Sequence, residues 1–143
     1  MAKINFHFQS GFFTIPNKGK LKKHIEYIFN TENKIFTDLN IIFCSDKFLL
    51  EINTQYLSHD FYTDVITFNL SQNRNEIIGE IYISVERVKE NARSLSIPFF
   101  IELHRVMYHG VLHLCGYNDA NQKSKRLIRK REEGYLHSFF SKI

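Results

Sequence analysis

The fold of this chain is decided by the stretch Glu102–Asp119, which reads ELHRVMYHGVLHLCGYND. His109 and His113 are four residues apart, and on an α-helix such positions lie on one face with Cβ atoms about 5–6 Å apart. Two imidazoles at that spacing can both bind one metal ion at about 2.0–2.1 Å. Gly116 predicts the end of the helix, because glycine tolerates the left-handed conformation that ends helices. Asp119 then offers a carboxylate, so the stretch predicts a metal site with three protein ligands and an open position.

A helical wheel places the two histidines on a narrow polar strip together with Glu102 and Arg105. Both flanks of this strip are apolar, which predicts a helix that is mostly buried. The histidines could instead be core residues bonded to backbone carbonyls, but the pair followed by glycine and a carboxylate favours a metal site. For Glu102 two roles stay open: a hydrogen-bond partner of a histidine, or an exposed first-turn residue that stabilises the helix dipole.

Length and composition predict one globular domain over residues 1–143, with 43% hydrophobic and 24% charged residues. The net charge of +4 permits an anionic partner without requiring one. Cys44 and Cys115 lie in apolar runs, which indicates buried thiols in a reducing compartment rather than a disulfide. The first residues lack the apolar segment of a signal peptide, and no apolar run is long enough to span a membrane. We therefore expect a cytoplasmic protein with no membrane partner.

Apolar residues with a period of two or of 3.6 predict the remaining elements. Strands are expected over residues 4–8, 39–44, 65–70 and 77–85, and a hairpin loop at 72–76 makes the last two antiparallel. Helices are expected over residues 17–30, 85–95 and 123–140. A further helix is expected from Ser45 as N-cap to about Tyr56, and it overlaps a polar, turn-prone segment at 53–64. With the histidine helix, this predicts an α+β fold: a small mixed sheet packed with four to five helices.

The predicted site points to hydrolysis. A metal ion that is bound by two imidazoles and a carboxylate, with one open position, activates water and polarises a carbonyl or phosphoryl oxygen. The ligand spacing is that of the metzincin proteases, HExxHxxGxxH, but Gly110 stands where those enzymes carry the glutamate that acts as general base. A closed structural site would need a fourth protein ligand, and Cys115 points about 120° away from His109 on the wheel. The open site is therefore favoured, and the general base is not identified.

The segment His109–Tyr117, HGVLHLCGY, resembles the signature of the YbeY family of ribosomal-RNA maturation endoribonucleases. Further matches follow the family's order and spacing and extend the resemblance over most of the chain: Asn53, Tyr56, TDVITF at 63–68, GEI at 79–81 and IS at 83–84. The resemblance implies a zincin-like, single-domain cytoplasmic hydrolase with one zinc ion. It further implies cleavage of single-stranded RNA, maturation of the 3′ end of 16S ribosomal RNA and a part in ribosome quality control. Its partners would be ribosomal RNA and the small ribosomal subunit, with no DNA expected.

The sequence departs from the family pattern at two positions. Asp119 stands where the family usually has its third histidine ligand, and Leu57 stands where it usually has an arginine linked to RNA handling. Residues that could take over from that arginine are His59, Arg74, Arg87 and Arg105. These departures favour one alternative to the nuclease, a ribosome-associated binding protein whose metal is structural. The ligand register keeps a second one open, a metalloprotease-like hydrolase.

A basic run follows the predicted metal ligands. Six cationic residues lie between positions 123 and 131, directly after the loop that carries Asp119. Of these, Lys123, Arg126 and Lys130 lie within about 60° of their mean direction on a helical wheel. A solubilising helix face is the simpler interpretation, but such a stripe could also contact the phosphates of a strand. We therefore expect RNA to bind at Lys123, Arg126 and Lys130.

Overall fold

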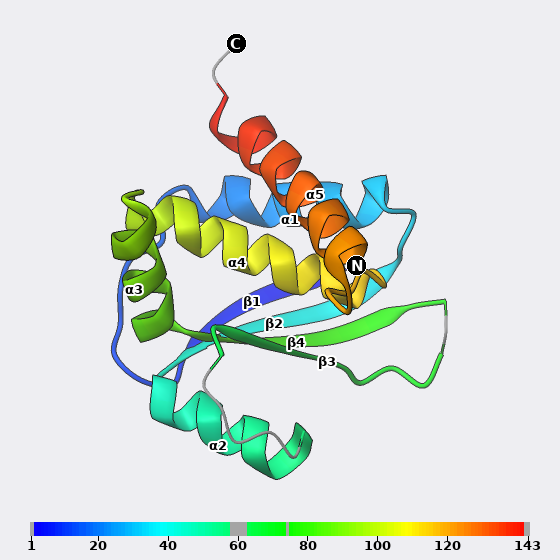
Figure 1. Cartoon of the computed structure of the whole chain (residues 1–143). Coiled ribbons are helices and arrows are strands. Elements are labelled where there is room, and N and C mark those ends of the chain that lie inside the picture. Colours follow the sequence, from blue (N-terminus) through cyan, green and yellow to red (C-terminus); the bar gives the residue numbers. More distant parts are fainter. Residues whose placement is uncertain (1, 58–62, 74, 142–143) are drawn as a thin grey trace.

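The computed structural model describes residues 2–57, 63–73 and 75–141. In these residues the chain forms four strands and five helices, which confirms the predicted α+β class (Figure 1). In chain order they are β1 (Lys3–Phe8), α1 (Lys18–Thr31), β2 (Phe36–Cys44), α2 (Asp46–Leu57), β3 (Val65–Asn69), β4 (Ile77–Ser84), α3 (Val85–Leu95), α4 (Phe99–Leu114) and α5 (Gln122–Phe140). No helix within these ranges is both long and apolar enough to cross a membrane.

The sheet is mixed, as predicted, with strand order β1-β2-β4-β3. The strands β1, β2 and β4 are parallel, and β3 pairs antiparallel with β4, which confirms the expected hairpin. Helices α1, α4 and α5 cover one face of the sheet and α2 lies on the other (Figure 1). One boundary differs from the prediction: β2 begins at Phe36 because that side chain is buried and stacks on Phe29. Helix α2 extends to Leu57, as its apolar pattern up to Tyr56 predicts, and Ile52 and Asn53 are buried in its packing although residues 53–57 belong to the turn-prone segment.

The core lies between the sheet and α4. Alternate residues of β2 and β4 point towards this helix and are fully buried, among them Leu39, Ile41, Ile81 and Ile83. Both flanks of α4 are buried as well, as the apolar wheel positions predicted. Gly110 allows a close approach of α4 to β4, since a Cβ atom built there would lie 2.8 Å from Ile81 Cγ2. The helix that carries the histidines is thereby held directly on the sheet.

Replacing Gly110 with alanine should lower the free energy of unfolding by about 1–3 kcal/mol, because the new methyl group overpacks the contact with Ile81. The matched control is Gly134→Ala in α5, where a Cβ atom would meet nothing within 4 Å. That change should stabilise the helix by about 0.5–1 kcal/mol. Urea unfolding of both variants measures the difference; stabilisation by both substitutions would show that α4 is free to move away from the sheet.

His104 makes stability depend on pH. It is 2% exposed, and its Nδ1 lies 2.7 Å from the hydroxyl of Tyr108. Burial, reinforced by the charges of His24 and Lys20, lowers the pKa of His104 to about 4. In the unfolded chain this histidine binds a proton near pH 6.5, whereas in the folded chain it binds one only near pH 4. The free energy of unfolding should therefore fall by up to about 3 kcal/mol as the pH drops from about 6.5 towards about 4.

The variant His104→Gln keeps a hydrogen-bonding group but cannot titrate, so it should show a weaker loss of stability between pH 6.5 and 4.5. Urea unfolding at a series of pH values, in the presence of a chelator, isolates this effect from metal release. Identical pH dependence in the two proteins would show that the pKa of His104 is the same in the folded and the unfolded chain.

Candidate metal centre

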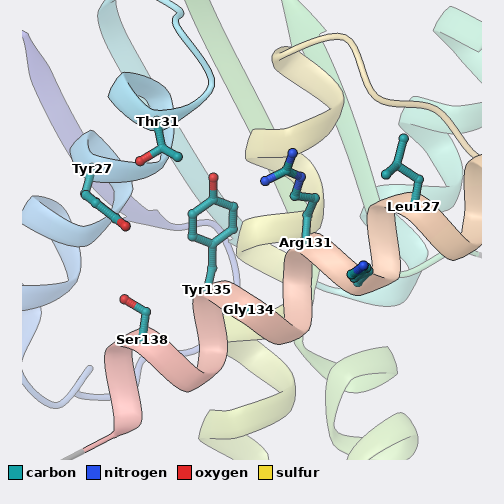
Figure 2. Close-up of a pocket in the computed structure, with 8 residues that line it drawn as sticks. Tyr27, Thr31, Leu127, Arg131, Gly134, Tyr135 and Ser138 are labelled. Atoms are coloured by element: carbon teal, nitrogen blue, oxygen red, sulfur yellow. The ribbon is translucent and has the colours of Figure 1, made fainter. Parts of the chain in front are cut away.

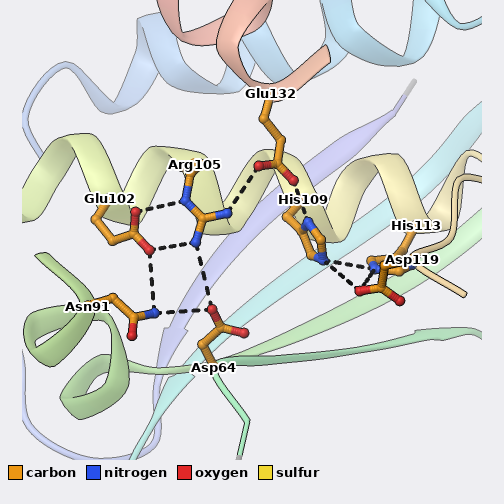
Figure 3. Close-up of polar contacts among 8 residues, drawn as sticks. All are labelled: Asp64, Asn91, Glu102, Arg105, His109, His113, Asp119 and Glu132. Atoms are coloured by element: carbon orange, nitrogen blue, oxygen red, sulfur yellow. Dashed lines mark hydrogen bonds and ion pairs between the residues drawn. The ribbon is translucent and has the colours of Figure 1, made fainter. Parts of the chain in front are cut away.

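The histidine helix ends where the sequence predicts. Gly116 adopts a left-handed φ of 107°, and the amide of Tyr117 donates a hydrogen bond to the carbonyl of Leu112 at 3.0 Å. This closes the helix after Leu114 and turns the chain back along the polar strip of α4. As a result Asp119 is brought to His109 and His113, and the three predicted ligands lie together (Figure 3).

The three donor atoms have the spacing that a metal ion needs. The Nε2 atoms of His109 and His113 are 2.9 Å apart, and Oδ2 of Asp119 lies 3.7 Å and 3.8 Å from them. A point equidistant from three such atoms is about 2.0 Å from each, the usual length of a zinc–nitrogen or zinc–oxygen bond. The group could therefore bind a metal ion, and it lines a hollow of about 400 Å³ together with Asn53, Leu57 and residues 63–67.

His109 is oriented by a residue that the sequence reasoning missed. Its Nδ1 is hydrogen-bonded to the carboxylate of Glu132, a buried residue of α5 (Figure 3). With the proton on Nδ1, the lone pair of Nε2 is directed at the other ligands. Burial, followed by the effect of neighbouring His109, lowers the pKa of His113, so the ring of His113 is neutral at pH 7 and can donate a lone pair.

Neither role considered for Glu102 is correct. The residue is 0% exposed, so it is not a solvated first-turn glutamate, and its partner is Arg105 rather than a histidine. Arg105 contacts Glu102 at 2.6 Å and Glu132 at 3.0 Å, and Glu132 is hydrogen-bonded to His109, so a chain of polar contacts runs from Glu102 to His109. The bond to Glu102 raises the pKa of Arg105. The polar strip of α4 is thus a single connected network.

Two of the four residues that could replace the family arginine are described by the structure, and both are engaged by carboxylates. Arg105 is held inside this network, and Arg87 is paired with Asp46 at 3.1 Å. His59 and Arg74 lie outside the described residues. The two cysteines are buried and unpaired, as predicted, and burial raises the pKa of each thiol to about 12. Cys115 is therefore protonated at neutral pH, and it is not among the grouped donor atoms.

The basic residues of α5 are divided between two faces of the helix. Lys125 and Arg129 line a hollow of about 290 Å³, and His109, Asp119 and Glu132 line it as well. Lys130, one of the three predicted RNA contacts, lines a different hollow next to α1, while Lys123 and Arg126 are exposed. The spacing of Lys125, Arg129 and Glu132, at i, i+4 and i+7, places all three on one face and was visible in the sequence. RNA binding by Lys123, Arg126 and Lys130 stays a prediction.

Comparison with known proteins finds a family model, similar sequences and a similar fold. A family model described as Endoribonuclease YbeY matches residues 6–140. The Endoribonuclease YbeY of Flavobacterium psychrophilum is 45% identical over 139 residues, which cover 97% of this chain and 98% of the relative. That of Amoebophilus asiaticus is 44% identical over 135 residues, or 94% of this chain and 92% of the relative. A solution structure of a Thermotoga maritima protein is 29% identical and matches with a TM-score of 0.65, over 96% of this chain and 89% of that one.

Proposed function

The chain belongs to the YbeY family of endoribonucleases, and on this premise we propose that it is a zinc-dependent endoribonuclease that cleaves single-stranded RNA. We further propose that residues 1–143 act as one metal-dependent hydrolase domain in the cytoplasm. Its substrate there would be ribosomal RNA on the small ribosomal subunit, where it matures the 3′ end of 16S ribosomal RNA and takes part in ribosome quality control.

The observation that carries the proposal is the group His109, His113 and Asp119, whose donor atoms are spaced for one ion. Two imidazoles and a carboxylate are a ligand set that hydrolytic zinc sites use. A zinc ion held there would supply Lewis acidity towards a phosphoryl oxygen and an activated water. The protein's own part is to hold the ligands: Glu132 fixes the ring of His109, and the turn at Gly116 brings in Asp119.

Two cations beside the ligands suit a phosphodiester substrate. Lys125 and Arg129 line the same hollow as His109 and Asp119, and both are exposed. Lysine and arginine contribute to RNA binding mainly through phosphate contacts, which release counterions and weaken with salt. At this position they can bind the phosphate next to the one that is cleaved. A peptide backbone carries no such charge at each unit.

The packing of Gly110 argues against the protease alternative. A zinc protease needs a glutamate at this position, but a Cβ atom there would lie 2.8 Å from Ile81 Cγ2 and 3.3 Å from Thr67 Cγ2. The position faces the sheet rather than the ligands, so it cannot carry a general base. The structural-metal alternative is disfavoured by the exposure of the ligands, since the Asp119 side chain is 53% exposed and the hollow in front of it is open to a substrate.

Incubation of the zinc-loaded protein with single-stranded RNA, duplex RNA and an unfolded protein tests the proposal. We expect cleavage of the single strand only, loss of cleavage with a chelator, and recovery on addition of zinc. Cleavage that survives complete removal of the metal, or digestion of the unfolded protein instead of RNA, would contradict it.

A further inference from the structure

A second hollow, of about 430 Å³, lies between α1 and α5 (Figure 2). Lys125 and Arg129 line another hollow and lie on the opposite side of α5 by helical spacing. Its lining pairs cations with aromatic rings and small hydroxyl groups: Lys130 and Arg131, Tyr27 and Tyr135, Thr31 and Ser138. Tyr27 and Thr31 come from α1 and the others from α5, so the hollow exists only because the two helices pack together.

This combination of groups matches one unit of a nucleic-acid strand. Tyr27 is 50% exposed and presents a ring on which a base can stack. Lys130 and Arg131 are exposed at the same rim and carry the charge that a phosphate requires. The volume lies within the range of small-ligand sites, about 300–1,000 Å³.

The carboxylate of Glu32 lies next to the hollow, because it is hydrogen-bonded to the lining residue Tyr135. Glu32 accepts hydrogen bonds from the hydroxyl of Tyr135 at 2.5 Å and from the hydroxyl of Tyr117 at 2.7 Å, one on each oxygen. Neutral hydroxyl donors do not remove the charge of this carboxylate. Lys130 and Arg131 nevertheless place two positive charges at the rim against the single charge of Glu32, so an anionic ligand is favoured.

Positive charge connects this hollow with the metal centre across α5. Lys125 and Arg129 face the ligands, Lys130 and Arg131 face the second hollow, and Arg126 is exposed between them. The helix is about 10–12 Å across, a distance that about two to four nucleotides of an extended strand cover. A smaller hollow of about 310 Å³ also adjoins the second one at Leu127 and reaches Asn118, the neighbour of Asp119.

We propose that the hollow between α1 and α5 is an RNA-binding subsite that holds one nucleotide of the substrate, about two to four nucleotides from the phosphate at the metal centre. Tyr27 stacks on the base, and Lys130 and Arg131 contact the phosphate. This subsite rests on the proposed function, because it assigns a second contact to the same strand. It also gives Lys130 and Arg126 a place along the path of the RNA.

The test compares cleavage of a three-nucleotide and an eight-nucleotide single-stranded RNA by the zinc-loaded enzyme. The double variant Tyr27→Ala/Arg131→Gln should raise KM for the long substrate about tenfold or more and leave kcat, and both constants for the short substrate, unchanged. The matched control is Phe12→Ala/Lys89→Gln, which removes an exposed ring and an exposed cation elsewhere and should behave as wild type. An unchanged KM for the long substrate, or an equal loss on both substrates, would overturn the subsite and leave the hollow to a protein ligand.

Photocrosslinking tests the same contact in the wild-type enzyme, so it does not depend on the folding of a variant. An eight-nucleotide RNA with 5-iodouridine at successive positions should crosslink to Tyr27 only from positions about two to four nucleotides away from the cleavage point. Absence of a Tyr27 crosslink from every position would overturn the proposal. If the wild type cleaves no RNA, the proposed function fails, and the crosslink still reports separately on the subsite.

Discussion

Replacing His113 with alanine should remove zinc from the protein and reduce RNA cleavage by about a thousandfold or more. Zinc is lost because only two of the three ligands, His109 and Asp119, remain to bind the ion. The rate falls because the ion lowers the activation free energy by several kcal/mol through charge stabilisation in the transition state. A loss of about 4 kcal/mol corresponds to a factor of about 10³ in rate. Elemental analysis and cleavage of single-stranded RNA measure the two effects on one preparation.

The same variant should still bind RNA, because Lys125 and Arg129 do not depend on the metal to stay in the hollow. His137→Ala serves as the control, since His137 is an exposed histidine in the last turn of α5 and is not one of the grouped ligands. Full zinc content and normal cleavage in His113→Ala would show that another residue holds the ion. Loss of RNA affinity together with cleavage would instead show that the ion, and not the cations of α5, carries substrate binding.

The elements that the sequence could predict are those determined by local patterns. The spacing of His109, His113 and Gly116 lies within one helix and its end, so it predicts both the ligands and the turn that brings in Asp119. The alternation in residues 65–70 and 77–85 likewise predicts a hairpin, and β3 and β4 are antiparallel. These inferences need no knowledge of how distant segments pack.

What the sequence reasoning missed depends on packing between helices. Glu132 lies 23 residues from His109 and touches it only because α5 crosses α4. A signal was nevertheless present: Ile128, Glu132, Tyr135 and Phe139 are spaced as one buried helical face, and Glu132 is the acidic residue on it. A carboxylate in such a position is buried only with a partner. The partner could not be identified before α4 and α5 were placed together.

Replacing Glu132 with alanine should therefore damage both the metal centre and the fold. His109 would lose the acceptor that fixes its tautomer, and zinc affinity should fall about 10- to 100-fold. Arg105 would keep Glu102 but lose one of its buried partners, which should cost about 3 kcal/mol of unfolding free energy. Competition for zinc with a chromophoric chelator, and urea unfolding without metal, measure these separately.

The neighbouring exposed residue provides the control, since Glu133→Ala should change stability by less than about 0.5 kcal/mol and leave zinc affinity unaltered. If the Glu132→Ala variant is less stable but binds zinc with unchanged affinity, Glu132 only neutralises Arg105. If Glu132 also orients His109, the free energy of unfolding and the zinc affinity must both fall.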